Sequence, residues 1–205
     1  TPFVLPSPPG PSPKAITTCV DWLENAKQPL IAIGGGSVKA ASEIRALAEK
    51  LDAPVINTVN AKGVLPYSHP LAIGGSSSCP AVRDALQSAD VVLAVGTEFG
   101  ETDYDYFFEG GVEIKGRLIR IDIDSSQLTR NIRSDLAICS DATLALQALN
   151  QLLKGSITDG SGVARATKIR NELQATRESG YEKFFEAIQS ALPEVIIAGD
   201  STQPI

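Results

Sequence analysis

The sequence predicts an α/β fold: a doubly wound, mainly parallel, Rossmann-like sheet of five or six strands with flanking helices. Two observations support this prediction. Short apolar runs, such as LIAI (30–33) and VVLAV (91–95), alternate along the chain with helical patterns. These runs are hydrophobic without interruption, which is typical of parallel strands buried on both faces, whereas half-exposed antiparallel strands alternate apolar and polar residues.

The predicted strands follow from the short apolar runs, each bounded by glycine, proline or small polar residues. They lie at 30–33, 54–59, 91–95, 118–123 and 136–139. Helices are predicted where apolar residues recur at helical spacing or where Ala, Leu and Glu dominate, at 14–27, 39–51, 79–89 and 142–155. Pro80 opens the third of these helices and Gly155 ends the fourth. The segment ETDYDYFFEGG, 101–111, is expected to be an acidic aromatic loop.

The domain organisation is predicted from the two ends of the chain. Six prolines within residues 1–13 exclude a helix or a central strand, so this stretch is expected to be an interdomain linker. Residues 14–155 form the Rossmann-like domain. Residues 156–205 are expected to hold linker helices and then VIIA (195–198), the first strand of a further, truncated domain. With no methionine at residue 1, we expect the chain to be a piece of a longer polypeptide.

Composition and charge exclude several classes of partner and functional site. A net charge of −6 and a pI of about 4.9 argue against nucleic acid or an anionic membrane as a partner, and no run approaches the roughly 18 apolar residues of a membrane span. Three scattered cysteines predict reduced, mostly buried thiols in a cytoplasmic protein. His69, the single histidine, is expected at the surface. Because no nucleophile–base set and no metal-ligand spacing can be assembled, we predict no catalytic or metal-binding residue here.

The candidate site lies at the carboxyl ends of the strands, where open α/β sheets bind their ligands. Gly34–Gly36 would let a phosphate approach the backbone, and Asp122 or Asp141 could accept a hydrogen bond from a ribose hydroxyl or an adenine amino group. Together they predict a nucleotide cleft. Three alternatives stay open: a tight glycine turn without a ligand, loop hydrogen bonding by Asp122, and Asp141 as a helix N-cap.

Five segments occur in a fixed order over residues 14–155: PLIAIGGGS, PVINTVNAKGVLPYSHPLAIG, ADVVLAVGTEF, RLIRIDIDSSQLTR and SDA. Together they resemble the central domain of thiamine diphosphate enzymes of the acetolactate synthase and pyruvate oxidase type. The resemblance implies a parent enzyme that acts on a 2-oxo acid, releasing CO₂ or joining a second carbonyl. It implies thiamine diphosphate and Mg²⁺ as cofactors, and a homodimer or homotetramer.

In flavin-bearing members of that group the central domain holds FAD, and others bind ADP or nothing there. The resemblance assigns to such a ligand Gly34, Gly35, Gly36, Thr58, Val59, Asn60, Gly75, Ser76, Asp122, Ile123, Gln127, Asp141 and Ala142. It places Asp200, Ser201 and Gln203 near the diphosphate of the thiamine cofactor. Glu98-Phe99-Gly100-Glu101 stands where acetolactate synthases have an arginine-containing segment. Two other functions stay possible: a free-standing NAD- or FAD-binding module, and a ligand-free oligomerisation scaffold.

Overall fold

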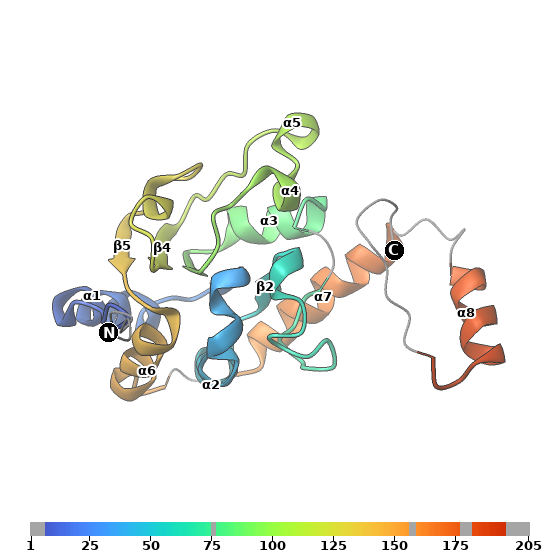
Figure 1. Ribbon diagram of the computed structural model, residues 1–205, viewed down its shortest axis with the longest axis horizontal. Helices are drawn as coiled ribbons and strands as arrows, with labels where there is room; N and C mark the ends of the chain where they lie inside the picture. Colours follow the sequence, from blue (N-terminus) through green and yellow to red (C-terminus); the bar gives the residue numbers. More distant parts are fainter. Residues whose placement is uncertain (1–6, 75–76, 156–158, 177–181, 196–205) are drawn as a thin grey trace, which may run out of the picture.

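The computed structural model describes residues 7–74, 77–155, 159–176 and 182–195. Its centre is a five-stranded sheet in which every neighbouring pair is parallel, in the order β2-β1-β3-β4-β5 (Figure 1). The strands are β1 (Pro29–Ile33), β2 (Val55–Asn57), β3 (Val91–Val95), β4 (Arg117–Asp122) and β5 (Leu136–Cys139). The predicted α/β class and the parallel sheet are therefore confirmed.

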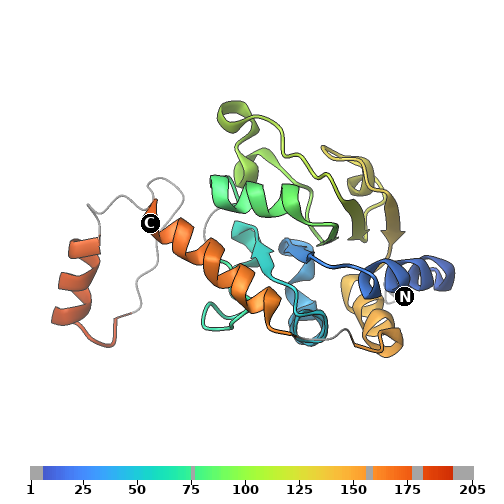
Figure 2. The same ribbon diagram turned by 180° about the vertical axis from the view of Figure 1, so that it is seen from behind.

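Both faces of the sheet are covered by helices (Figures 1 and 2). Ile31 and Leu93 belong to a hydrophobic cluster with α1 (Pro13–Glu24), α2 (Ala41–Leu51) and α6 (Ala142–Leu152). Their strand neighbours, such as Leu30 and Val92, point the other way, into a second cluster with α3 (Pro80–Ser88) and α7 (Ser161–Ala175). This alternation explains why the strands are apolar at every position.

Several element boundaries differ from the sequence predictions. The predicted strand 54–59 stops at Asn57, because residues Val59–Ala61 turn into the short 3-10 helix η2. The helix predicted from residue 39 begins at Ala41, after a 3-10 turn, η1 (Gly35–Ala40). The predicted loop 101–111 contains two single helical turns, α4 (Glu101–Tyr104) and α5 (Tyr106–Glu109). Burial of Tyr104, which is 1% exposed, anchors this segment to the sheet.

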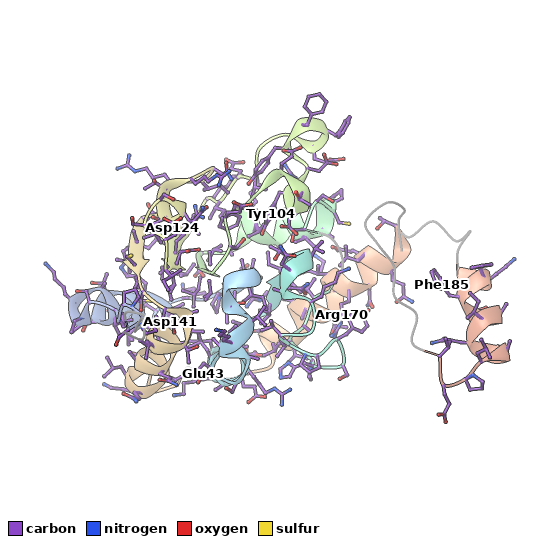
Figure 3. All side chains as sticks on the ribbon, in the orientation of Figure 1. Glu43, Tyr104, Asp124, Asp141, Arg170 and Phe185 are labelled. Carbon is purple, nitrogen blue, oxygen red and sulfur yellow. The ribbon has the colours of Figure 1, made fainter. Side chains whose placement is uncertain are left out.

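Beyond residue 155, α7 packs on the sheet domain. Ala166 is fully buried in the second cluster, and the Gly162 N–H donates to the Asp52 carboxylate at 2.8 Å. Arg170 lies on the same helix (Figure 3). Its guanidinium donates to the Ala72 carbonyl at 3.0 Å. Helix α8 (Glu182–Ala191), which bears Phe185, stands apart from the sheet in both views. The predicted strand 195–198 lies outside the described residues except for Val195, which follows a turn.

Two predictions about single side chains are wrong in part. The His69 side chain is 12% exposed: its Nε2 lies 3.2 Å from the Glu49 carboxylate, and its Nδ1 accepts from the Leu71 N–H. It is therefore a packed loop residue. Of the three free cysteines, Cys19 alone is fully buried, and burial raises its pKa to about 12. Among the described residues, no helix has the length and hydrophobicity needed to cross a bilayer.

Candidate functional site

The strand order places a topological switch point between β1 and β3, where the chain first winds toward β2 and then returns to the other side of β1. Ligands of open α/β folds bind at such a point, beyond the carboxyl ends of the strands. A cavity of about 320 Å³ lies there. It is lined by residues at or just beyond the carboxyl ends of β1, β3, β4 and β5: Gly35, Gly36, Val38, Lys39, Gly96, Ile121, Asp122, Ile123, Ser140, Asp141 and Ala142.

The floor of this cavity is a contact between two glycine turns. Gly96, which follows β3, has a φ of +58°, and a Cβ placed on it would lie 2.6 Å from the Gly36 Cα. The Gly36 N–H donates to the Gly96 carbonyl at 3.0 Å, and Gly34 abuts the same turn. Glycine is therefore required here for the close approach of two backbones, while Gly35 and Gly36 remain exposed to the cavity.

The opposite wall is the turn between β5 and α6 together with the end of β4. The Ser140 N–H donates to the Asp122 carbonyl at 2.9 Å, which ties the two segments together. Asp141 lies at the junction of β5 and α6 (Figure 3), and its carboxylate accepts from the Leu144 N–H at 3.1 Å. Asp141 is thus an N-cap as well as a wall residue, so capping and ligand contact are compatible at this position.

Loop hydrogen bonding also engages Asp122. One of its carboxylate oxygens accepts a hydrogen bond from the Asp124 N–H at 3.0 Å. A carboxylate has two acceptor oxygens, so Asp122 can also accept a hydrogen bond from a ligand. Backbone and side-chain hydrogen bonds from Ser126 lower the pKa of Asp124, which keeps this loop anionic. This side of the cavity therefore carries a carboxylate that can accept hydrogen bonds from hydroxyl or amino groups.

The lining of the cavity includes Ile123, which the sequence analysis predicted, and Val38 and Lys39, which it missed. Val38 and Ile123 are 51% and 57% exposed, and both line the cavity, where they could contact a planar base. Lys39 supplies a basic side chain on the η1 side. Val38 and Lys39 lie in the first turn after the glycine triplet, so the rule that helix N-termini face the ligand could have identified them.

The structure does not bring every predicted residue into this cavity. Val59 and Asn60 lie on η2 and Thr58 precedes it, next to the cavity lining, and the Val59 N–H donates to the Asp103 carboxylate at 2.8 Å. Gln127 sits on η3 (Gln127–Thr129) and its side chain bonds to Asp124, outside the cavity lining. The remaining predicted residues lie outside the described part of the chain: Gly75, Ser76, Asp200, Ser201 and Gln203.

The acidic aromatic segment 101–111 is held by hydrogen bonds within the chain. The Arg83 guanidinium donates to the carbonyls of Tyr104, Glu109 and Gly111 at 2.8 to 2.9 Å. The Glu101 carboxylate accepts from the Phe107 N–H at 3.0 Å. Within the described residues, no group of three or more His, Cys, Asp or Glu side chains is placed to hold a metal ion.

Larger hollows exist elsewhere on the described surface, but their positions do not suit a ligand of this fold. One of about 650 Å³ lies at the amino ends of β3 and β4, bordered by Asp90, Arg117 and Asp135. Another, of about 580 Å³, runs along one side of α7 between Ala164 and Ala175. Because neither borders the carboxyl ends of the strands, the cavity at the switch point remains the candidate ligand site.

Comparison with known proteins gives one family and several relatives. Residues 16–149 match the family model described as thiamine pyrophosphate enzyme, central domain. A probable 2-ketoarginine decarboxylase of Pseudomonas aeruginosa is 32% identical over 198 residues, which are 94% of this chain and 35% of that protein. The chloroplastic acetolactate synthase 1 of Oryza sativa subsp. japonica is 31% identical, over 90% of this chain and 28% of that protein.

Solved structures show the same fold. Benzoylformate decarboxylase from Polynucleobacter necessarius superimposes with a TM-score of 0.64 at 20% identity, covering 78% of this chain and 30% of that one. The chain thus spans about a third of the length of the relatives it matches.

Proposed function

Because the chain belongs to the thiamine pyrophosphate enzymes and contains their central domain, we propose that it forms this domain in a cytoplasmic enzyme that decarboxylates or joins 2-oxo acids. The relatives include a decarboxylase, acetolactate synthases and an acetyltransferase. When bound, thiamine diphosphate supplies the carbanion that attacks the 2-oxo carbon. The described residues of this chain contribute to the scaffold and to a nucleotide site.

The cavity at the β1/β3 switch point is the observation that supports the nucleotide site. We propose that it holds the ADP moiety that ADP and FAD share. The Gly35–Gly36 backbone and Lys39 would face the phosphates, and Asp122 would accept from the ribose. Ile123 and Ala142 would contact the adenine. Where acetolactate synthases have an arginine, Glu98 pairs with Arg130 at 3.1 Å, which favours ADP over FAD.

A melting experiment on the 205-residue chain tests the nucleotide site. We expect ADP at 100 times its Kd to stabilise the fold by about 2.7 kcal/mol. For a chain of this size the melting temperature should therefore rise by roughly 5–10 °C. Asp122→Ala should reduce this shift, whereas Asp21→Ala, on the exposed side of α1, should not. If ADP, FAD and NAD all leave the melting temperature unchanged, the ligand-free scaffold is the better interpretation.

The activity needs the complete polypeptide, assayed with thiamine diphosphate and Mg²⁺. Since the relative that aligns over 94% of this chain is named for 2-ketoarginine, we expect CO₂ release from this guanidino 2-oxo acid to exceed release from pyruvate or benzoylformate. Omission of thiamine diphosphate is the control and should abolish the reaction. If no 2-oxo acid loses CO₂, the proposed chemistry is wrong. Gel filtration of the same protein tests the proposed dimer or tetramer.

A further inference from the structure

We infer that the proline-rich segment before α1, residues 7–12, is a strap that positions one wall of the nucleotide cavity. Because the strap holds this wall in place, its contact with the wall should strengthen the binding of a ligand in the cavity. The inference rests on the proposed nucleotide site, although the mechanical role of the strap can be tested without any ligand.

The strap meets the cavity wall at one carbonyl group. The Pro9 carbonyl accepts a hydrogen bond from the Asp141 N–H at 2.9 Å and a second from the Ser140 Oγ at 3.1 Å. Both donors belong to residues that line the cavity. Because Ser140 also donates its N–H to the Asp122 carbonyl, the Pro9 contact is linked directly to the acidic wall.

This contact supplies an acceptor for two donors at the start of α6. Asp141 precedes α6, so its N–H has no carbonyl one turn earlier in that helix to accept it. The Ser140 side chain is fully buried, and its hydroxyl has two acceptors within reach: the Asp141 carbonyl at 3.0 Å and the Pro9 carbonyl at 3.1 Å. The Pro9 contact is the one that joins this hydroxyl to the segment before α1. The segment that supplies the acceptor lies about 130 residues earlier in the sequence.

The sequence of the segment suits a strap. Pro8, Pro9 and Pro11 restrict the backbone before docking, which reduces the entropy lost when the segment is ordered. Prolines also cannot donate to a sheet, so the segment remains outside the strands while its carbonyls accept hydrogen bonds. The downstream end is anchored by α1, whose Ile16, Cys19 and Leu23 are buried in the same cluster as α6 residues.

Coupling follows from the shared wall. A ligand that contacts Asp122 and Asp141 favours the wall position that Pro9 holds. The strap therefore increases the affinity for the ligand, and the bound ligand stabilises the strap contact by the same free energy. Two neutral hydrogen bonds can shift such an equilibrium by roughly tenfold. We therefore expect loss of the strap to weaken ADP binding by about that factor and leave the glycine side of the cavity unchanged.

Amide hydrogen exchange of the 205-residue chain tests the mechanical role. In a variant that lacks residues 1–10, we expect exchange at the Asp141 amide to accelerate at least about tenfold, because its acceptor is removed. The Gly36 amide, which donates to the Gly96 carbonyl, should be unaffected and reports that the sheet is intact. Unchanged exchange at Asp141 would overturn the inference.

Calorimetric titration with ADP tests the coupling. We expect the Kd to rise about tenfold without residues 1–10 and about threefold in Ser140→Ala, which keeps the full chain. The matched control is Ser88→Ala, which removes a hydroxyl that donates to the Ala85 carbonyl far from the cavity, and its Kd should not change. Faster exchange at Asp141 with an unchanged Kd would refute the coupling. If the unmodified chain binds no nucleotide, the proposed site is wrong, and the exchange at Asp141 alone decides the role of the strap.

Discussion

Replacement of Gly96 by alanine is expected to lower the free energy of unfolding by about 3–5 kcal/mol and to abolish nucleotide binding. The φ of +58° disfavours an L side chain, and the new Cβ would lie 2.5 Å from the Gly36 carbonyl carbon and 2.7 Å from the Ser37 nitrogen. These are backbone atoms, so no rotamer change can relieve the clash. The two glycine turns would have to separate, which would open the floor of the cavity. Urea unfolding and ADP titration measure the two effects.

Gly63→Ala is the matched control for this change. Gly63 also has a positive φ, +88°, but a Cβ there meets no atom within 4 Å. This variant therefore introduces only backbone strain, which should lower the free energy of unfolding by about 1 kcal/mol and leave ADP binding unchanged. If Gly96→Ala is no more destabilising than Gly63→Ala, the close approach of the two turns is not what requires glycine at this position.

Arg120→Met should be comparably destabilising, by about 3–5 kcal/mol. Arg120 is 1% exposed in the middle of β4, and its guanidinium donates to the carbonyls of Thr97, Arg130 and Ile132 at 2.7 to 2.8 Å. Burial lowers its pKa from the ordinary arginine value, and Asp122 opposes this shift. Methionine fills the space but leaves three carbonyls without their donor. Thermal and urea unfolding measure the loss.

Arg117→Met, on the same strand, controls for the loss of a positive charge. Arg117 is exposed and its guanidinium lies 4.5 Å from the centre of the Trp22 ring, so its removal should cost about 0.5–1 kcal/mol. The Arg120 variant should also loosen the loops after β3 and β4, since Arg120 joins Thr97 to residues 130–132. Equal losses in the two variants would mean that the buried carbonyl contacts of Arg120 contribute little.

The family of the chain and the order of its elements could be predicted without coordinates, because the five apolar runs and the glycine turns are local patterns. The strands at 91–95 and 136–139 were predicted at their observed bounds. Strand 54–59 was predicted too long, because the apolar pattern cannot show that β2 ends at Asn57 and that η2 begins at Val59. There, the Thr58 N–H still donates to the Ile33 carbonyl, a contact that local sequence does not encode.

The candidate site was predicted in part for the same reason. Asp122 ends β4, and Gly36 and Asp141 lie shortly after the ends of β1 and β5. The parallel topology brings these strand ends to one edge, so the meeting of the three residues followed from the fold class. The contact of Gly96 with Gly36 could not be predicted, because it depends on how closely β1 and β3 approach.

By itself, the sequence determined the α/β class, the family and the edge of the sheet at which most of the described candidate site residues meet. Those properties depend on hydrophobic periodicity and on glycines at strand ends, which are features of neighbouring residues. Only the tertiary structure decided which residues share the cavity, that Arg120 is buried, and that Pro9 bonds to the Asp141 turn. The physical reason is that these contacts join residues far apart in sequence, and their geometry depends on how the whole sheet and its helices pack.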